Sequence, residues 1–231
     1  MNDTTTDLNM ALEDAVEFAE NPEPRCACIL LLDTSASMQG APLDALSAGL
    51  QTFKHDLGKS PLTLRRAEIA IVGFDDNIKV LQDFVTADRF EPPTISQLGS
   101  ATHMCAGIDT ALDMVHNRKT EYRKNGVTYY RPWVFMITDG EPTGEPPGEV
   151  NRIAERVRDD EANKRVSFYC VGVESANMET LRKISVRQPI KLAGLHFDEL
   201  FVWLSASMQR VSGGKTDEQV PLQPIGWGTA G

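Results

Sequence analysis

The chain has 231 residues, 23 Lys and Arg against 33 Asp and Glu, and a formal net charge of −10 at pH 7. This length suits one large domain with its own core, and the acidity argues against nucleic acid or an anionic membrane as the main partner. No stretch approaches the ~18 apolar residues of a membrane span, and the acidic N-terminus lacks the features of a signal peptide, so we expect a cytoplasmic protein.

The first 24 residues form an extension in which we expect a short amphipathic helix. The helix would open at Thr6 or Asp7 and end at the sequence ENPEPR. Its apolar residues fall on one stripe, which comprises Leu8, Ala11, Leu12, Ala15 and Val16. The helix either caps the domain or binds a partner.

Residues 29–38 read ILLLDTSASM, an aliphatic run that stops at Asp33 and is followed by Ser35 and Ser37. The run predicts a buried parallel strand, whose carboxyl end is where open α/β sheets place their ligands. The D-x-S-x-S spacing lets one loop aim three hard oxygens at one point, a set that suits Mg²⁺ or Mn²⁺ better than Ca²⁺. The alternative is that these residues only build a strand-to-helix turn.

The pattern beyond this loop alternates between helix and strand. Pro42 can occupy the first turn of a helix with apolar residues at near-helical spacing over 43–53. The run AEIAIVGF, residues 67–74, predicts a buried strand. A turn at 75–77 then leads into IKVLQDFV, which would give the sheet one antiparallel edge strand.

A second apolar strand ends on a carboxylate. Thr102 stands isolated in LGSATHM, the residues 108–115 mark a helix, and a polar stretch covers 118–130. The strand over Trp133–Thr138 then runs directly into Asp139. Two buried strands that end in carboxylates indicate one shared site at the edge of the sheet.

The remaining elements complete an α/β pattern: a helix over 150–162, the strand SFYCVGV, a short helix over 178–184, the segment IKLAGL and a last helix over 197–211. They predict a doubly wound, mostly parallel central sheet with one antiparallel edge strand and helices on both faces. We divide the chain into an extension (1–24), a domain (25–212) and a C-terminal tail (213–231). In the tail, Trp227 either docks on the domain or stays disordered.

Four cysteines are too few and too scattered for a disulfide framework. Cys26 and Cys28 share one face of the first strand, and Cys170 lies inside an apolar strand, so we expect buried, inert thiols. Cys105, just after Thr102, is expected to serve packing as well.

Three segments, DTSAS, the isolated Thr102 and ITDGEPT, resemble the three loops of the metal-ion-dependent adhesion site of von Willebrand factor A (VWA) domains. The order of segments over 26–212, including FDELFVWLSASM, resembles the TerY-like branch of bacterial VWA proteins. The resemblance implies a VWA, Rossmann-like fold. It also implies Mg²⁺ held by the first aspartate and the serines, a second-loop threonine that contacts it directly or through water, and a third-loop aspartate that acts through water. Carried over by position, these residues are Asp33, Ser35, Ser37, Thr102 and Asp139.

The second loop departs from this pattern. His103 and Met104 follow Thr102, where relatives have small or aliphatic residues. His103 would either bind a softer metal or an anion, or lie on the surface without such a role. Ser100, two residues before Thr102, could take the place of that threonine as a ligand.

Three functional classes fit these residues. The first is a non-enzymatic, Mg²⁺-dependent binding module whose open metal position accepts an Asp or Glu from another protein. The second is a haloacid dehalogenase-like phosphohydrolase that uses Asp33, but Ser35 occupies the position where that class needs an acid/base carboxylate. The third is a structural subunit with a vestigial site. The TerY resemblance implies a role in tellurite resistance and stress response, with a protein kinase or a PP2C-type phosphatase as partner.

Overall fold

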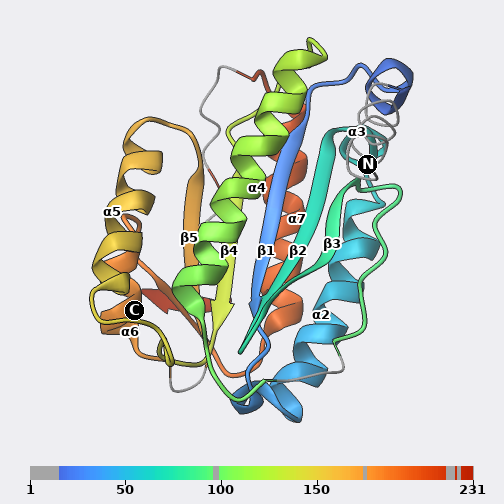
Figure 1. Ribbon diagram of the computed structural model, residues 1–231. Coiled ribbons are helices and arrows are strands. Elements are labelled where there is room, and N and C mark those ends of the chain that lie inside the picture. The colour runs from blue at the N-terminus through green and yellow to red at the C-terminus, as the bar shows by residue number, and fades with distance from the viewer. Residues whose placement is uncertain (1–15, 96–98, 174–175, 217–221, 223–224, 231) are drawn as a thin grey trace, which may run out of the picture.

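The computed structural model describes residues 16–95, 99–173, 176–216, 222 and 225–230. Seven strands form one sheet in the order β3-β2-β1-β4-β5-β6-β7, with helices around it (Figure 1). The strands are β1 (Cys26–Asp33), β2 (Ala67–Phe74), β3 (Ile78–Thr86), β4 (Trp133–Thr138), β5 (Ser167–Gly172), β6 (Ile190–Leu192) and β7 (Gly228–Ala230).

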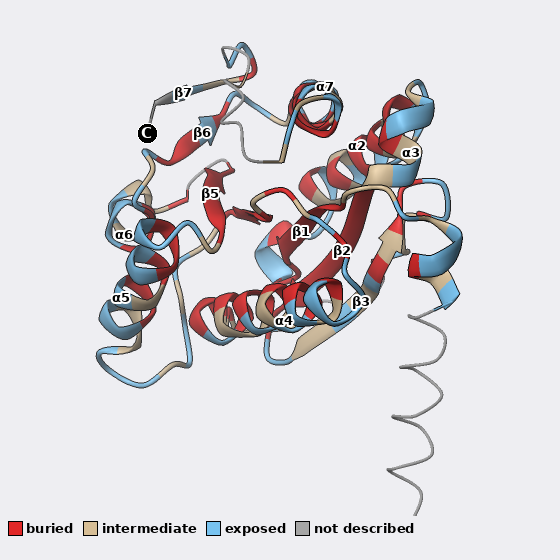
Figure 2. Cartoon of the chain, turned by 90° about the horizontal axis from the view of Figure 1, so that it is seen from above, coloured by how far each residue is buried: buried red, intermediate tan, exposed pale blue. Residues whose placement is uncertain are grey.

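The helices lie in two layers, one on each face of the sheet. The helices are η1 (Ala36–Met38), α2 (Ala41–Leu57), α3 (Pro61–Arg66), α4 (Met104–Lys124), α5 (Glu149–Ala162), α6 (Met178–Ile184) and α7 (Phe197–Gly213). Figure 2 shows α2 and α7 on one side of the strands and α4 and α5 on the other. Among the described residues, no helix combines the length and apolar character needed to cross a membrane.

Alternate side chains of β1 point into two separate cores, as the period of two in a strand requires. Cys28, Leu30 and Leu32 join the core beneath α2 and α7, whereas Ile29 and Leu31 join the core beneath α4 and α5. Because both faces are covered, the strand is apolar throughout instead of alternating with polar residues.

The sheet reverses its winding between β1 and β4. The chain passes from β1 outward to β2 and β3, and then returns to place β4 on the other side of β1. Both strands run parallel with Leu32 opposite Ile137, so their last residues, Asp33 and Thr138, emerge side by side. Such a switch point is where open α/β sheets bind ligands.

The predicted sheet is confirmed, with one addition. β2 and β3 form the expected antiparallel hairpin at one edge. At the other edge, β7 pairs antiparallel with β6. This pairing was not predicted, because a three-residue strand of Gly, Thr and Ala has no recognisable strand pattern in the sequence. The helix α3, which begins at Pro61 behind the Ser60 N-cap, was also not predicted.

We expected the helix to give way to a polar stretch over 118–130, and this was wrong at the start of the stretch, because α4 continues to Lys124. Arg118 and Lys119 are buried within this helix. Arg118 pairs with the buried Glu68, and Lys119 donates to the Arg165 carbonyl, so tertiary partners make these positions part of the packed surface of the helix.

Trp227 docks on the domain instead of remaining free. Its side chain is 2% exposed, and its ring packs edge-on against Trp203 of α7 with centroids 5.6 Å apart. The segment that we assigned to a tail therefore supplies a strand and a core residue. The predicted N-terminal helix lies mostly outside the described residues, although 16–20 are helical and Phe18 is buried.

Candidate metal site

Asp33 is the last residue of β1, and its side chain is fully buried. One carboxylate oxygen, Oδ1, accepts the backbone N–H of Ser35 at 2.9 Å. The other, Oδ2, accepts the Thr138 hydroxyl from the neighbouring strand at 2.6 Å. The carboxylate is therefore fixed in place by its own loop and by the end of β4.

The two serines and Asp139 form a chain of hydrogen bonds beside Asp33. The hydroxyls of Ser35 and Ser37 lie 2.9 Å apart, and Ser37 donates to Asp139 Oδ1 at 2.8 Å. Ser35 and Asp139 are buried, whereas Ser37 is exposed. The site therefore opens to solvent at Ser37, and the first and third loops meet there.

Thr102 brings the second loop to the same place. A Cβ built on Gly140 would lie 3.7 Å from both Asp33 Oδ2 and Thr102 Oγ1, so these two oxygens flank the same glycine. Thr102 is held by Thr143, whose hydroxyl accepts the Thr102 N–H at 2.9 Å and whose own N–H donates to the Thr102 carbonyl at 3.0 Å. The three loops thus converge around Gly140.

Ser100 is engaged elsewhere. Its N–H and hydroxyl both donate to the carboxylate of Asp76, at 2.8 and 3.1 Å. Hydrogen bonds from Ser100 and Ala101 lower the pKa of Asp76. The geometry therefore favours Thr102 over Ser100 as the second-loop oxygen at the site.

His103 lies against the third loop. Its Nε2 would be 2.8 Å from a Cβ on Gly144, which has a φ of +75°. The ring thus packs on a glycine that has no side chain to displace it. Cys105 is buried nearby, and burial together with a hydrogen bond to Glu145 raises the pKa of its thiol. All four cysteines are buried and free, as predicted.

The Asp33 carboxylate has no basic partner in the part of the chain that the structure describes. Burial raises the pKa of Asp33, the hydrogen bonds from Ser35 and Thr138 lower it, and the Asp139 carboxylate raises it again, with a net upward shift. In the described part of the chain, no Lys or Arg forms an ion pair with Asp33 or Asp139. Two neighbouring carboxylates without a cation are unfavourable in a buried setting.

The other buried carboxylates of the described residues all have basic partners. Glu68 is bound by Arg25 and Arg118. Glu161 is bound in the same way by Arg131 and Arg187. The remaining pairs are Asp56 with Lys59, Asp75 with Lys79, and Asp160 with Arg165. Asp33 and Asp139 are thus the exceptions, at the point where the sheet reverses its winding.

The donor set fits a hard divalent cation. Two carboxylates and three hydroxyls lie on three converging loops, and oxygen donors of this kind suit Mg²⁺ or Mn²⁺ that retains some water. No group of three or more His, Cys, Asp or Glu able to hold a metal occurs among the described residues. A site here would therefore depend on the hydroxyls of Ser35, Ser37 and Thr102 in addition to Asp33 and Asp139.

Sequence reasoning missed the roles of Thr138 and Thr143. Thr138 holds Asp33, and Thr143 holds Thr102. Thr138 could have been found as a polar residue at the end of an otherwise apolar strand, one position before Asp139. No local signal marks Thr143, because its role depends on the fold of two loops about 40 residues apart.

The comparisons with known proteins agree with the fold. The family model of the von Willebrand factor type A domain matches residues 28–193. A search of curated proteins found no match to the chain.

Three solved structures are similar in fold. A von Willebrand factor type A protein from Catenulispora acidiphila has a TM-score of 0.60 and 15% identity, and the match covers 81% of this chain and 43% of that one. The pilus adhesin SpaC from Lactobacillus rhamnosus GG, in an open conformation, has a TM-score of 0.64 and 12% identity, with 81% of this chain and 30% of that one covered. Proximal thread matrix protein 1 from the mussel byssus, with a zinc-occupied MIDAS motif, has a TM-score of 0.54 and 16% identity, with 81% of this chain and 48% of that one covered. The chain thus spans less than half of each of these structures. At such identities the likeness shows the fold.

Proposed function

The chain belongs to the von Willebrand factor type A domain family, and from this premise we propose that it is a metal-dependent protein-interaction module. One observation carries the proposal. Asp33 and Asp139 lie beside each other at the switch point of the sheet, surrounded by hydroxyls and without a basic partner among the described residues. A bound cation would supply the missing positive charge.

Mg²⁺, or Mn²⁺ in its place, would be held by Asp33, Ser35 and Ser37, with Thr102 and Asp139 completing the set. The hydrogen bond from Ser37 to Asp139 leaves lone pairs on the serine oxygen for a cation. A mussel protein of the same fold has a MIDAS motif occupied by zinc, which supports a divalent cation as the class of ligand.

The partner would supply an Asp or Glu carboxylate to the metal. Of the described residues, two carboxylates and otherwise neutral hydroxyls would face the cation, so its charge would remain available to an incoming anionic oxygen. Ser37 is exposed and gives access from solvent. Following the TerY resemblance, we propose a cytoplasmic role in bacterial stress response and tellurite resistance, with a protein kinase or a PP2C-type phosphatase as partner.

We propose further that the chain is not an enzyme. A dehalogenase-like phosphohydrolase would use Asp33 as nucleophile and a second carboxylate two residues later as general acid/base. Ser35 stands there, and the nearest carboxylate along the hydrogen-bonded chain, Asp139, accepts from Ser37. Turnover of a generic phosphate ester that disappears in Asp33→Asn would revive the enzymatic alternative.

Affinity capture from bacterial lysate tests the proposal. The immobilised chain should retain a partner in Mg²⁺ and release it in chelator, and Asp33→Ala should retain none. Thr102→Ala should weaken capture more than it weakens metal binding measured by calorimetry, because Thr102 lies on a separate loop. A partner that binds equally well in excess chelator would place recognition on another surface.

A further inference from the structure

The loops at the carboxyl edge of the sheet are acidic and contain no Lys or Arg in their described residues. These loops are 34–40, 75–77, 99–103, 139–148, 176–177 and 193–196. The acidic residues of this edge, counting Asp33 at the end of β1, are Asp33, Asp75, Asp76, Asp139, Glu141 and Glu145. Of these, Asp75 alone has a basic partner among the described residues, Lys79 at the start of β3.

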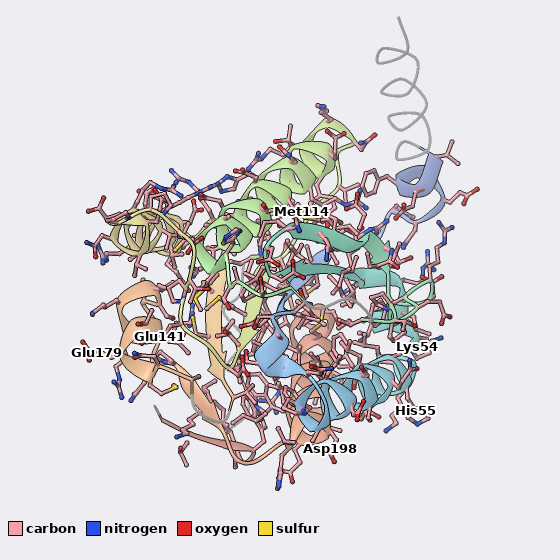
Figure 3. The ribbon with its side chains drawn as sticks, turned by 60° about the horizontal axis from the view of Figure 1, so that its bottom comes forward. Lys54, His55, Met114, Glu141, Glu179 and Asp198 are labelled. Carbon is pink, nitrogen blue, oxygen red and sulfur yellow. The ribbon has the colours of Figure 1, made fainter. Side chains whose placement is uncertain are left out.

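The helices that begin at this edge add more acidic residues. Their first turns carry Asp44 in α2, Glu149 in α5, Glu179 in α6, and Asp198 and Glu199 in α7. Three of these have basic partners: Glu149 pairs with Arg152, Glu179 with Lys183 and Glu199 with His196. Figure 3 views this end and shows Glu141 near Glu179, across the view from Lys54 and His55 in the last turn of α2. These acidic side chains offset the partial positive charge at the N-termini of their helices, so the helix dipoles contribute little positive charge against the acidic loops.

The opposite edge of the sheet carries charges of both signs, with Glu17, Glu20 and Glu23 in the segment before β1. Loops and helix ends there carry Arg25, Arg66, Arg131, Arg165 and Arg187. Arg25, Arg131 and Arg187 hold Glu68 and Glu161. The net charge of the chain is therefore unevenly distributed, and the negative end is the end with the proposed metal site.

A divalent cation would not neutralise this edge. Five carboxylates, those of Asp33, Asp76, Asp139, Glu141 and Glu145, form no ion pair with a described Lys or Arg, and the cation carries two charges. An exposed rim of negative charge, chiefly Asp76 and Glu141, would remain around the metal. A partner that offered only a carboxylate in acidic surroundings would meet repulsion just outside the site.

We infer that the carboxylate donated to the metal lies in a basic segment of the partner, with Lys or Arg within two residues on either side. An extended chain advances about 3.3 Å per residue. The Debye length at physiological ionic strength is about 8 Å, so two flanking positions on each side lie inside the field of the rim. This inference rests on the proposed function and adds the chemistry of the partner.

Glu141 is the side chain best placed to test the inference. It is exposed and lies two residues after Asp139, outside the proposed metal set. Its carboxylate accepts a hydrogen bond from the Asn177 side chain, which also caps α6. Asp76 is less suitable because its carboxylate organises the second loop through Ser100 and Ala101.

The experiment uses a pool of nonapeptides with a fixed central Glu and randomised flanks. The pool is loaded on the immobilised wild-type chain in Mg²⁺ and eluted with chelator, and the eluate is sequenced. We expect Lys and Arg to be enriched within two positions of the central Glu. For single peptides chosen from the eluate, Glu141→Lys should raise Kd about fivefold in fluorescence anisotropy.

A second column, with the Asp33→Ala variant, separates the possible failures. Asp33→Ala should yield no chelator-eluted peptides, and an eluate equal to that of the wild type would overturn the proposed metal site itself. If only the wild type retains peptides but their flanks match the input pool or favour Asp and Glu, the basic-segment inference is wrong while the metal site stands. A wild-type column that retains nothing, while calorimetry registers Mg²⁺, also overturns the inference.

Glu20→Lys is the matched control for Glu141→Lys. It makes the same charge change on an exposed residue that precedes β1, at the opposite edge of the sheet. Peptide affinity should be unchanged in this variant. An equal loss in both variants would mean that net charge, and not the rim, governs binding.

Discussion

The hydroxyl of Thr138 donates a 2.6 Å hydrogen bond to Asp33 Oδ2, joining the last residues of two adjacent parallel strands. The same hydroxyl accepts the Gly140 N–H at 3.2 Å, so it ties Asp33 to the start of the third loop. Thr138 thus positions Asp33 from outside the predicted metal set.

Thr138→Val should weaken Mg²⁺ binding about tenfold without removing a ligand, because loss of a supporting hydrogen bond typically costs 10- to 100-fold in metal affinity. Calorimetric titration measures the change. Thr110→Val, which removes an exposed hydroxyl bonded within α4, serves as control and should bind normally. Equal affinities in wild type and Thr138→Val would show that the hydrogen bond does not orient Asp33.

Mg²⁺ should raise the melting temperature of the wild type but not of Asp33→Asn. At a free concentration 100 times Kd, binding adds about 2.7 kcal/mol to the free energy of unfolding. In chelator, Asp33→Asn should be at least as stable as the wild type, because it removes a buried charge that has no basic partner among the described residues. Differential scanning calorimetry measures both, and an equal Mg²⁺ shift in the variant would contradict the site.

Asp109→Asn should lower the free energy of unfolding by about 1 kcal/mol at pH 7. Asp109 accepts from Arg152 and Arg156, and so joins α4 to α5. Burial raises the pKa of Asp109, but the hydrogen bonds from the two arginines outweigh it, so the pKa is lowered overall.

A carboxylate with a lowered pKa stabilises the fold above its unfolded pKa, and the effect is lost as the pH falls through the folded value. The difference between wild type and Asp109→Asn should therefore shrink below pH 4. Urea unfolding at a series of pH values measures it. A difference that persists at the lowest pH would point to packing instead of charge.

Trp227→Ala should reduce the free energy of unfolding by about 3 kcal/mol, since it leaves a cavity beside Trp203. Trp227→Phe should cost less, because the ring contact survives and the buried indole Nε1, which has no hydrogen-bond partner among the described residues, is removed. Chemical unfolding followed by tryptophan fluorescence measures the series. Ile225→Ala, at a residue 39% exposed, should have little effect.

Glu68→Gln should cost about 3–5 kcal/mol, because it leaves Arg25 and Arg118 buried without their shared counter-ion. Phe18 lies over both guanidinium groups, 5.3 and 4.9 Å from its ring centroid, so the variant should also loosen the N-terminal helical turn. Limited proteolysis before residue 25 would report this loosening. Unchanged protection would separate Phe18 from the charge network.

Local pattern was sufficient for the first loop and for most strands and helices, but not for α3, β7 or the end of α4. The apolar run before Asp33 and the D-x-S-x-S spacing act within one segment, where side-chain period and chain direction are fixed by the backbone. The same applies to the strand before Asp139 and to the short helix at 178–184, which the structure places at Met178–Ile184. Membership of the VWA family followed from these segments and their order, and the family match confirms it.

Contacts between distant segments could not be predicted in this way. The pairing of Thr138 with Asp33 requires the register of β1 on β4, and the burial of Trp227 requires β7 to find β6. The lack of a basic partner for Asp33 and Asp139 among the described residues also depends on the tertiary structure, which places a Lys or Arg beside each of the other described buried carboxylates. These relationships depend on how elements far apart in the chain pack together, which the periodicity of any single element does not encode.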